Sequence, residues 1–359
     1  MNSKTDPDNP AAPPQARSKT IVATLLTFLP LLGILIAGIA FVSCSKDGDR
    51  PEFRLTYSIF FPSTHVHTKL AEQWAEEITR RTQGRVVIDI YSGAVLSSAS
   101  ENYDCVLHGV SDLGMSCFSY SRGLFPLVEC LDLPHGYPDG KTATSIANDF
   151  INHFQPKELA YTHFLYAHAH GPGLLATQAP VQALADVRGL SIRGTGITAM
   201  IINALGANAV GMSQPDTFEA LRKGVVNGTL CPMETLKGWK QGEVINYVTK
   251  IPAIGYTTTM FVVMNKKTWE KLPDDIKKIF TEVSQEWIPK HGQAWDDADD
   301  EGTQFVTELG KTVTAIAPEE NQKASEALEP LFDRWAQEVK QKNLPGLEAL
   351  VFINNKLGR

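Results

Sequence analysis

The chain has 359 residues, of which 43% are hydrophobic and 20% are charged. This composition is typical of a folded protein, and the length suggests roughly two domains of about 150 residues each. The formal net charge is −7, so no basic surface is expected to displace phosphate counterions, which argues against nucleic acid as a partner.

The first 50 residues predict an export and membrane-targeting segment. Residues 1–20 are rich in Pro, Ala, Asp and Asn and are typical of a disordered cytoplasmic n-region. Residues 21–45 carry no charge and are long enough to cross a bilayer, with Arg17 and Lys19 holding their N-terminal end inside. We therefore expect residues 21–50 to be a signal or anchor with its linker, and the chain from Lys46 onward to face the periplasm.

The apolar segment ends in Phe41-Val42-Ser43-Cys44, which resembles the lipobox of bacterial lipoproteins. In that motif a small residue precedes a cysteine that is lipidated, although Phe41 stands where leucine is usual. Two alternatives remain open, namely lipidation at Cys44 or an uncleaved signal anchor. Both predict a periplasmic protein that is tethered to a membrane.

Four further cysteines show no CxxC spacing, so neither a redox motif nor a zinc knuckle is predicted. They are Cys105, Cys117, Cys130 and Cys231. An oxidising compartment permits a disulfide, but the spacing assigns none, and buried free thiols are expected.

Strands and helices are predicted to alternate in the first exported unit. Apolar residues at spacings of four follow Thr64 and predict a helix that Gly84 closes. The predicted strands are 53–61, 85–91 and 110–115, and a second helix covers 100–108. Alternation of this kind favours a mostly parallel sheet, with ligands outside the carboxyl ends of its strands.

The same pattern restarts after Pro180 and is followed by a different arrangement. The predicted strands are 189–193, 209–212 and 225–231, and the helices between them are 198–205 and 216–223. A strand at 256–265 and long helices at 273–309 and about 319–342 come afterwards. This strand and these helices follow two complete units, which suggests that the chain returns to the first unit and packs against both.

The predicted fold class is therefore α/β of the periplasmic-binding-protein type, with two α/β lobes, a ligand cleft between them and a long helix that spans both. Lobe I is expected to comprise residues 51–172 and about 256–297. Lobe II is expected to comprise residues 173–255 and about 298–345, and residues 346–359 are expected to be a C-terminal tail.

Several segments, in this order, resemble the DctP-type extracytoplasmic solute-binding proteins of tripartite ATP-independent periplasmic (TRAP) transporters. They are FFPSTHVHTKLAEQWAEEITRRTQGRVVIDIY, VSDLGM, LDLPHGYPD, ADVRGLSIRG, LGANAVGMSQPDTFEALRKGVVNG, EVINYVTK and MNKKTWEKLPDDIKK. The resemblance implies a receptor that binds a small organic acid and delivers it to the membrane subunits of a TRAP permease. It implies neither an enzyme nor a cofactor.

Arg193 ends the GLSIRG segment, and the resemblance implies that this arginine forms a salt bridge with the ligand carboxylate. A planar guanidinium offers two parallel donors to a carboxylate and stays charged when it loses water. Many relatives carry a second arginine in the preceding strand, but HAHGPGLLATQAP contains none. The sequence therefore predicts a monocarboxylate with an apolar or aromatic body rather than a dicarboxylate.

Further candidates for ligand contacts lie near the expected cleft. They are Phe60, His65, Phe118, Tyr120, Gln214, Cys231, Met233, Glu234 and Trp239. For the aromatic residues, packing in a lobe core is the alternative, and for His65 it is helix capping. Glu234 either meets an ammonium group of the ligand or favours the N-terminus of a helix.

Other classes of protein are weighed by their motifs. His168 and His170 would share one face of a strand, and with His65, His67, His135 and His163 they could suggest a metal cluster. No HExxH motif, GxSxG elbow or P-loop accompanies them, so no metal is expected. An ABC-type or chemosensory receptor is the nearer alternative, and an extracytoplasmic metal-dependent hydrolase is the one from another class.

Overall fold

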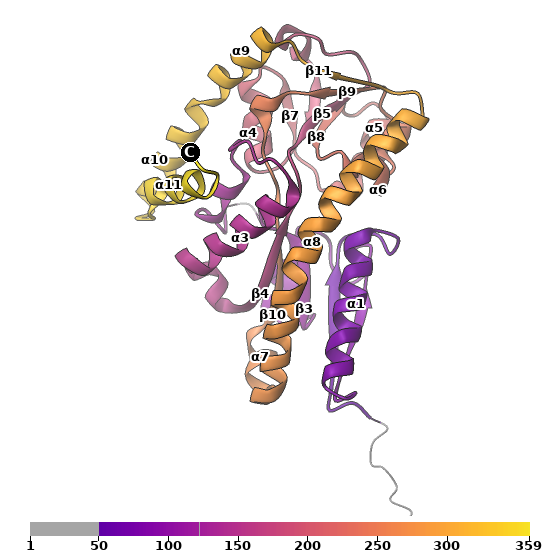
Figure 1. Ribbon diagram of the computed structural model, residues 1–359, viewed down its shortest axis with the longest axis vertical. Helices are drawn as coiled ribbons and strands as arrows, with labels where there is room; N and C mark the ends of the chain where they lie inside the picture. Colours follow the sequence, from indigo (N-terminus) through magenta and orange to yellow (C-terminus); the bar gives the residue numbers. More distant parts are fainter. Residues whose placement is uncertain (1–49, 122) are drawn as a thin grey trace, which may run out of the picture. The chain divides into compact units, whose positions relative to one another are not determined.

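The computed structural model describes residues 50–121 and 123–359 (Figure 1). The n-region predicted at 1–20, the apolar segment at 21–45 and the lipidation site at Cys44 lie outside the described residues. Within the described part of the chain, no helix combines the length and the apolar character that crossing a membrane requires.

The first sheet has five strands in the order β2-β1-β3-β10-β4. Their bounds are β1 (Phe53–Ile59), β2 (Val86–Tyr91), β3 (Leu113–Cys117), β4 (Thr162–Ala169) and β10 (Thr259–Asn265). Strand β1 is parallel to β2 and β3, whereas β10 is antiparallel to β3 and β4. All seven residues of β10 are buried, which fits its place inside the sheet.

The second sheet has six strands in the order β11-β9-β5-β8-β6-β7. Their bounds are β5 (Leu174–Thr177), β6 (Ser191–Arg193), β7 (Asn208–Val210), β8 (Gly228–Cys231), β9 (Tyr247–Lys250) and β11 (Thr312–Ala315). Strand β5 is antiparallel to β8 and β9. Both sheets are thus mixed, because β5 and β10 each enter from the other sheet without the helical crossover that a parallel neighbour needs.

Helices cover both sheets. The first sheet carries α1 (Val66–Arg81), α2 (Asn102–Leu107), α3 (Gly140–Phe154) and α7 (Lys266–Lys271). The second carries α4 (Ile197–Ala204), α5 (Gln214–Arg222) and α6 (Glu234–Gly238). The long helix α8 (Asp274–Glu308) packs on α1, α3 and β4 and also on α6 and β11, so it spans both halves, as the sequence predicted (Figure 1).

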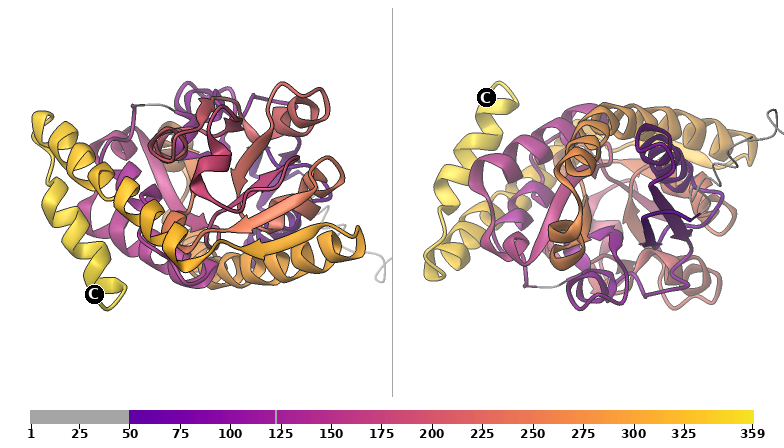
Figure 2. Two further views of the ribbon diagram at one scale, coloured as in Figure 1. Left: turned by 90° about the horizontal axis from the view of Figure 1, so that it is seen from above. Right: turned by 90° about the horizontal axis from the view of Figure 1, so that it is seen from below.

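The C-terminal region differs from the sequence-based expectation. The single helix expected at about 319–342 is divided into α9 (Pro318–Leu328) and α10 (Pro330–Gln341), because Pro330 has no N–H to continue the hydrogen bonding. Residues expected in a tail form α11 (Gly346–Lys356), which lies beside α3 (Figure 2). Ala349 and Ile353, four residues apart, are buried and anchor this helix.

Helix α8 carries the chain from the first sheet to β11 of the second, and two shorter segments also cross between the sheets, namely 170–173 after β4 and 251–258 after β9. They are hydrogen-bonded to each other, since Gly173 N–H donates to the Tyr256 carbonyl at 2.9 Å and the Thr257 hydroxyl donates to the His170 carbonyl at 2.6 Å. The lobe boundaries expected at 172–173 and 255–256 lie in these crossings; the full extent of each lobe stays a prediction.

Candidate ligand-binding site

A small cavity lies between the two sheets. Its volume, counted as the space open to the centre of a water molecule, is about 40 Å³. The first sheet and its helices contribute Phe60, Phe61, Cys117, Tyr120, Met260 and Trp295. The second contributes Arg193, Thr195, Thr198, Gln214, Leu230, Cys231, Pro232, Glu234, Thr235 and Trp239, and the crossing segments contribute His170, Tyr256 and Thr258. The carboxyl ends of β1, β3, β6 and β8 all reach this cavity, which is where open α/β sheets bind ligands.

Arg193 is the last residue of β6 and is only 6% exposed. Its Nε donates to the Met212 carbonyl at 3.0 Å, and its Nη2 donates to the Tyr120 hydroxyl at 3.3 Å. Among the described residues, no acidic side chain forms an ion pair with it. A buried guanidinium without an anion is costly, so this cavity favours a negatively charged ligand group.

Gln214 adds a second donor beside Arg193. Its backbone N–H donates to the Tyr120 hydroxyl at 3.0 Å, and the side chain is buried. The side-chain Nε2 has no hydrogen-bond partner among the described residues. Burial raises the pKa of Tyr120, so its phenol stays neutral and accepts both hydrogen bonds. These donors together form the electropositive end of the cavity.

Glu234 supplies the only acidic side chain in the cavity lining among the described residues. It is 2% exposed, and its Oε1 lies 2.7 Å from His65 Nε2. The backbone N–H of Glu234 donates to Oδ1 of Asp299, a residue of α8, at 2.7 Å. His65 therefore stands behind Glu234 rather than in the lining, and it joins the start of α1 to the start of α6.

The capping alternative for His65 is the arrangement that the structure shows. His65 is the N-cap residue of α1, and its Nδ1 accepts a hydrogen bond from His67 N–H at 3.3 Å. A ring nitrogen here replaces the Ser, Thr, Asp or Asn oxygen that usually fills this role.

Aromatic rings form one wall of the cavity. The rings of Phe60 and Trp239 stack with centroids 5.9 Å apart and an interplanar angle of 17°. Tyr120 meets Phe60 edge-on at 5.8 Å. Phe60 comes from the first half and Trp239 from the second, so the wall itself crosses between the halves. Such a surface suits a flat apolar body.

Besides His65, two of the predicted residues lie outside the cavity lining. Phe118 points into a core cluster, where its ring packs edge-on against Phe125 at 4.9 Å and Phe261 at 5.2 Å. Met233 packs in the core beside the second sheet. The remaining predicted residues apart from His65 do line the cavity: Phe60, Tyr120, Arg193, Gln214, Cys231, Glu234 and Trp239.

The structure also brings in residues that the sequence did not single out for the site. Tyr256 and Thr258 come from a segment that crosses between the sheets, and Trp295 comes from the middle of α8. Thr195 and Thr198 follow Arg193, and their position directly after a strand end was the only sequence signal for any of these. Thr195 N–H donates to Thr198 Oγ1 at 2.7 Å, which shapes the turn into α4.

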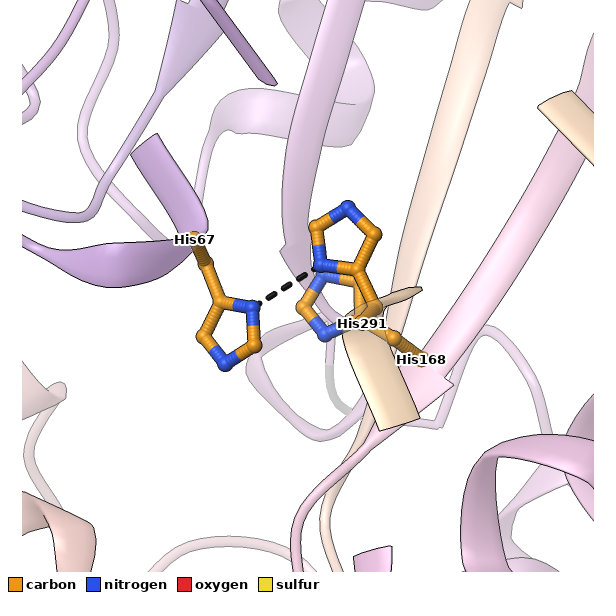
Figure 3. Close-up of side chains that lie close together, drawn as sticks. All are labelled: His67, His168 and His291. Carbon is orange, nitrogen blue, oxygen red and sulfur yellow. Dashed lines mark hydrogen bonds between the residues drawn. The ribbon is translucent and has the colours of Figure 1, made fainter. Parts of the chain in front are cut away.

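Three histidines gather in the core beside this site (Figure 3). His67 of α1, His168 of β4 and His291 of α8 are fully buried, and one nitrogen of each lies within 4.8 Å of the others. Burial lowers the pKa of all three, that of His291 to about 3, so the rings stay neutral.

Two of the three rings are hydrogen-bonded to each other, and the third, His168, is hydrogen-bonded to Trp295. His67 Nδ1 and His291 Nδ1 are 2.8 Å apart (Figure 3), and the Tyr166 hydroxyl lies 3.2 Å from His291 Nε2. The Trp295 indole donates to His168 Nδ1 at 3.1 Å, which leaves the proton of neutral His168 on Nε2. The spacing of the three histidines alone would allow a metal ion. His168 Nε2 carries the ring proton as long as Trp295 donates to Nδ1, so Nε2 could become a metal ligand only if the Trp295 indole turned away and the proton moved to Nδ1.

Of the other histidines in the suggested cluster, His65 packs on His67 with centroids 5.5 Å apart, whereas His163 and His135 lie apart. His163 stacks on Trp269 with centroids 3.5 Å apart, and His135 bonds the Cys130 carbonyl at 2.9 Å. The four described cysteines are free thiols; Cys117, Cys130 and Cys231 are buried, as expected, whereas Cys105 is only half-buried.

Two α/β halves, a cleft between them and a long helix that spans both define the class of two-lobed solute-binding receptors. Residues 57–338 match the family described as bacterial extracellular solute-binding protein, family 7 (DctP), so the chain belongs to this family. It is a DctP-type receptor of the kind that serves TRAP transporters.

Similar proteins are spread over several bacteria. A solute-binding protein of Chromohalobacter salexigens is 23% identical and aligns over 94% of this chain and 97% of its own. A TRAP solute-binding protein of Rhodoferax ferrireducens, solved with copurified benzoate, is 25% identical over 85% of this chain and 97% of its own, with a TM-score of 0.80. One of Bordetella bronchiseptica, solved with (R)- and (S)-mandelate, is 26% identical over 85% and 98%, with a TM-score of 0.79.

Proposed function

We propose that this receptor captures a small monocarboxylate with an apolar or aromatic body in the periplasm and delivers it, chemically unchanged, to its TRAP permease. The observation that carries the proposal is the buried guanidinium of Arg193, which has no acidic partner among the described residues. A ligand carboxylate would supply the missing anion and would accept two parallel hydrogen bonds.

The surroundings of Arg193 favour one carboxylate rather than two. Arg193 is the only arginine or lysine in the cavity lining formed by the described residues. Other parts of the lining are aromatic or weakly polar, including Phe60, Trp239 and Cys231. A second carboxylate would lose its water there without a cation to replace it. The aromatic acids bound by the Rhodoferax and Bordetella proteins fit the same reasoning.

The receptor is expected to work while held at the membrane. The segment that would hold it, either an apolar anchor at 21–45 or a lipid on Cys44, belongs to this proposal. A tether would keep the loaded receptor close to the permease and so raise its effective concentration there.

Thermal unfolding and calorimetry with a panel of aromatic and aliphatic acids test the proposal. A ligand at 100 times its Kd stabilises the folded state by about 2.7 kcal/mol through mass action. Arg193→Ala should weaken binding of every active acid about 100-fold or more, because a buried charge pair loses one partner. Arg193→Lys should restore only part of the affinity, because an ammonium group cannot form the paired hydrogen bonds.

Arg222→Ala is the matched control, since Arg222 is an exposed arginine of the same half, paired with Glu219 at 2.6 Å. It should leave binding unchanged. Retained affinity in Arg193→Ala, or thermal shifts with sugars or cations but with no acid, would refute the proposed function.

A further inference from the structure

The carboxylate of Glu234 is the second buried charge of the cavity. Its only titratable neighbour in a close pair among the described residues is His65, whose Nε2 lies 2.7 Å from Oε1. Its other oxygen, Oε2, accepts a hydrogen bond from the Thr235 hydroxyl at 3.2 Å. A carboxylate has about four acceptor positions, so these two partners leave capacity for a further donor.

The imidazole of His65 faces Glu234, with Nε2 2.7 Å from Oε1. Its Nδ1 accepts a hydrogen bond from His67 N–H, so the ring proton of a neutral imidazole must sit on Nε2, which faces Glu234. The imidazole therefore directs the carboxylate without cancelling its negative charge. Among the described residues, Glu234 and Arg193 also form no ion pair with each other.

Gly238 shows that the position of the carboxylate is sterically defined. A Cβ atom at Gly238 would lie 1.9 Å from Glu234 Oε1 and 3.0 Å from His65 Nε2. Only a residue without a side chain leaves space for this pair. The side chains of Trp239 and Phe61, which pack on His65 with centroids 5.8 and 4.2 Å away, exclude water from its other faces.

The charges of the lining are already balanced before a ligand enters, with one cation, Arg193, and one anion, Glu234. A simple carboxylate bound to Arg193 would leave Glu234 with His65 and Thr235 as its only side-chain partners among the described residues, and would bring no donor of its own. A ligand that also carries a donor would satisfy both ends of the cavity.

We infer that the ligand is a monocarboxylic acid that also carries a hydrogen-bond donor, a hydroxyl or an ammonium group, and that Glu234 accepts from this donor. This inference rests on the proposed function and narrows its ligand class. Glu234 is then the residue that sets specificity, and His65 is a positioning residue that acts through it.

Calorimetry with matched pairs of acids tests the inference. Benzoate is compared with 3-hydroxybenzoate, and phenylacetate is compared with 3-hydroxyphenylacetate, mandelate and phenylglycine. In the wild type, at least one acid with a donor should bind about 10- to 100-fold tighter than its donor-free counterpart, which is the range for a hydrogen bond to a charged group. Comparing the affinities of mandelate and phenylglycine shows whether the preferred donor is a hydroxyl or an ammonium group.

In Glu234→Leu this ratio should fall to about 1, because the acceptor of the ligand's donor is removed. Glu234→Gln provides a second measurement if the leucine variant does not fold. An amide oxygen still accepts from a hydroxyl but carries no charge, so preference for an ammonium ligand should fall by at least about 10-fold. His65→Leu should lower the ratio, and His65→Gln, which still has a side-chain N–H donor, should restore it.

Two results overturn the inference. One is equal affinity for donor-bearing and donor-free acids in every wild-type pair, and the other is a ratio that survives in Glu234→Leu or, for an acid with an ammonium group, in a folded Glu234→Gln. Either would leave the proposed function intact, provided that Arg193→Ala still abolishes acid binding. If none of these acids binds and the wider panel also fails, the proposed function falls with the inference.

Discussion

Replacing His291 with phenylalanine should flatten the pH dependence of stability. His291 is fully buried, and burial lowers its pKa to about 3, whereas an unfolded chain binds this proton near pH 6.5. Below pH 6.5 the unfolded state takes up a proton that the folded state does not, so the free energy of unfolding falls as the pH falls towards 3. Between pH 7 and pH 5 this single group contributes a loss of about 2 kcal/mol.

Urea unfolding at pH 7 and pH 5 measures this contribution. His291→Phe also removes the contacts with His67 and Tyr166, and that loss lowers stability at both pH values and cancels in the difference. The decrease in stability between the two pH values should be about 2 kcal/mol smaller in the variant than in the wild type. His108→Gln, at an exposed histidine, is the control.

Other buried groups make the comparison with a variant necessary. Burial raises the pKa of Asp132 to about 8 and that of Asp299 to about 7, and these carboxyl groups favour the folded state as the pH falls. Their contribution opposes that of the histidines in the wild type but is common to both proteins. If wild type and His291→Phe lose the same stability between pH 7 and pH 5, the reasoning about a neutral buried imidazole is wrong.

Two further predictions address the crossing segment at 170–173 and the membrane tether. Gly173→Ala would place a Cβ atom 2.0 Å from the ring of Tyr256, so it should lower the free energy of unfolding by about 1–3 kcal/mol and weaken acid binding. Gly211→Ala is the control, because no atom lies within 4 Å of its Cβ, and it should change neither quantity. Equal effects of the two substitutions would contradict the steric argument. Cys44→Ala should abolish incorporation of radiolabelled fatty acid in cells if Cys44 is lipidated, and labelling that persists would exclude this cysteine.

Much of the framework followed from local sequence patterns. The helix at α1 and the long helix at α8 were predicted from repeated apolar positions, and β1, β2 and β10 from runs of β-branched and aromatic residues. Strands β4, β5, β9 and β11 were not among the predicted strands, whereas β6 and β7, with three residues each, were predicted from the alternation of strands and helices around them. The antiparallel entry of β5 and β10 was missed because strand direction depends on contacts far apart in the sequence.

The sequence by itself determined the family and a single cationic anchor, because Arg193 lies at a strand end within an ordered set of family motifs. Tertiary structure alone decided what surrounds that anchor. His65 lies behind Glu234 and not in the lining, and Phe118 packs in a core cluster. Tyr256 and Trp295 line the cavity. The physical reason is that burial and pairing of these side chains are set by neighbours from other elements, which no local pattern records.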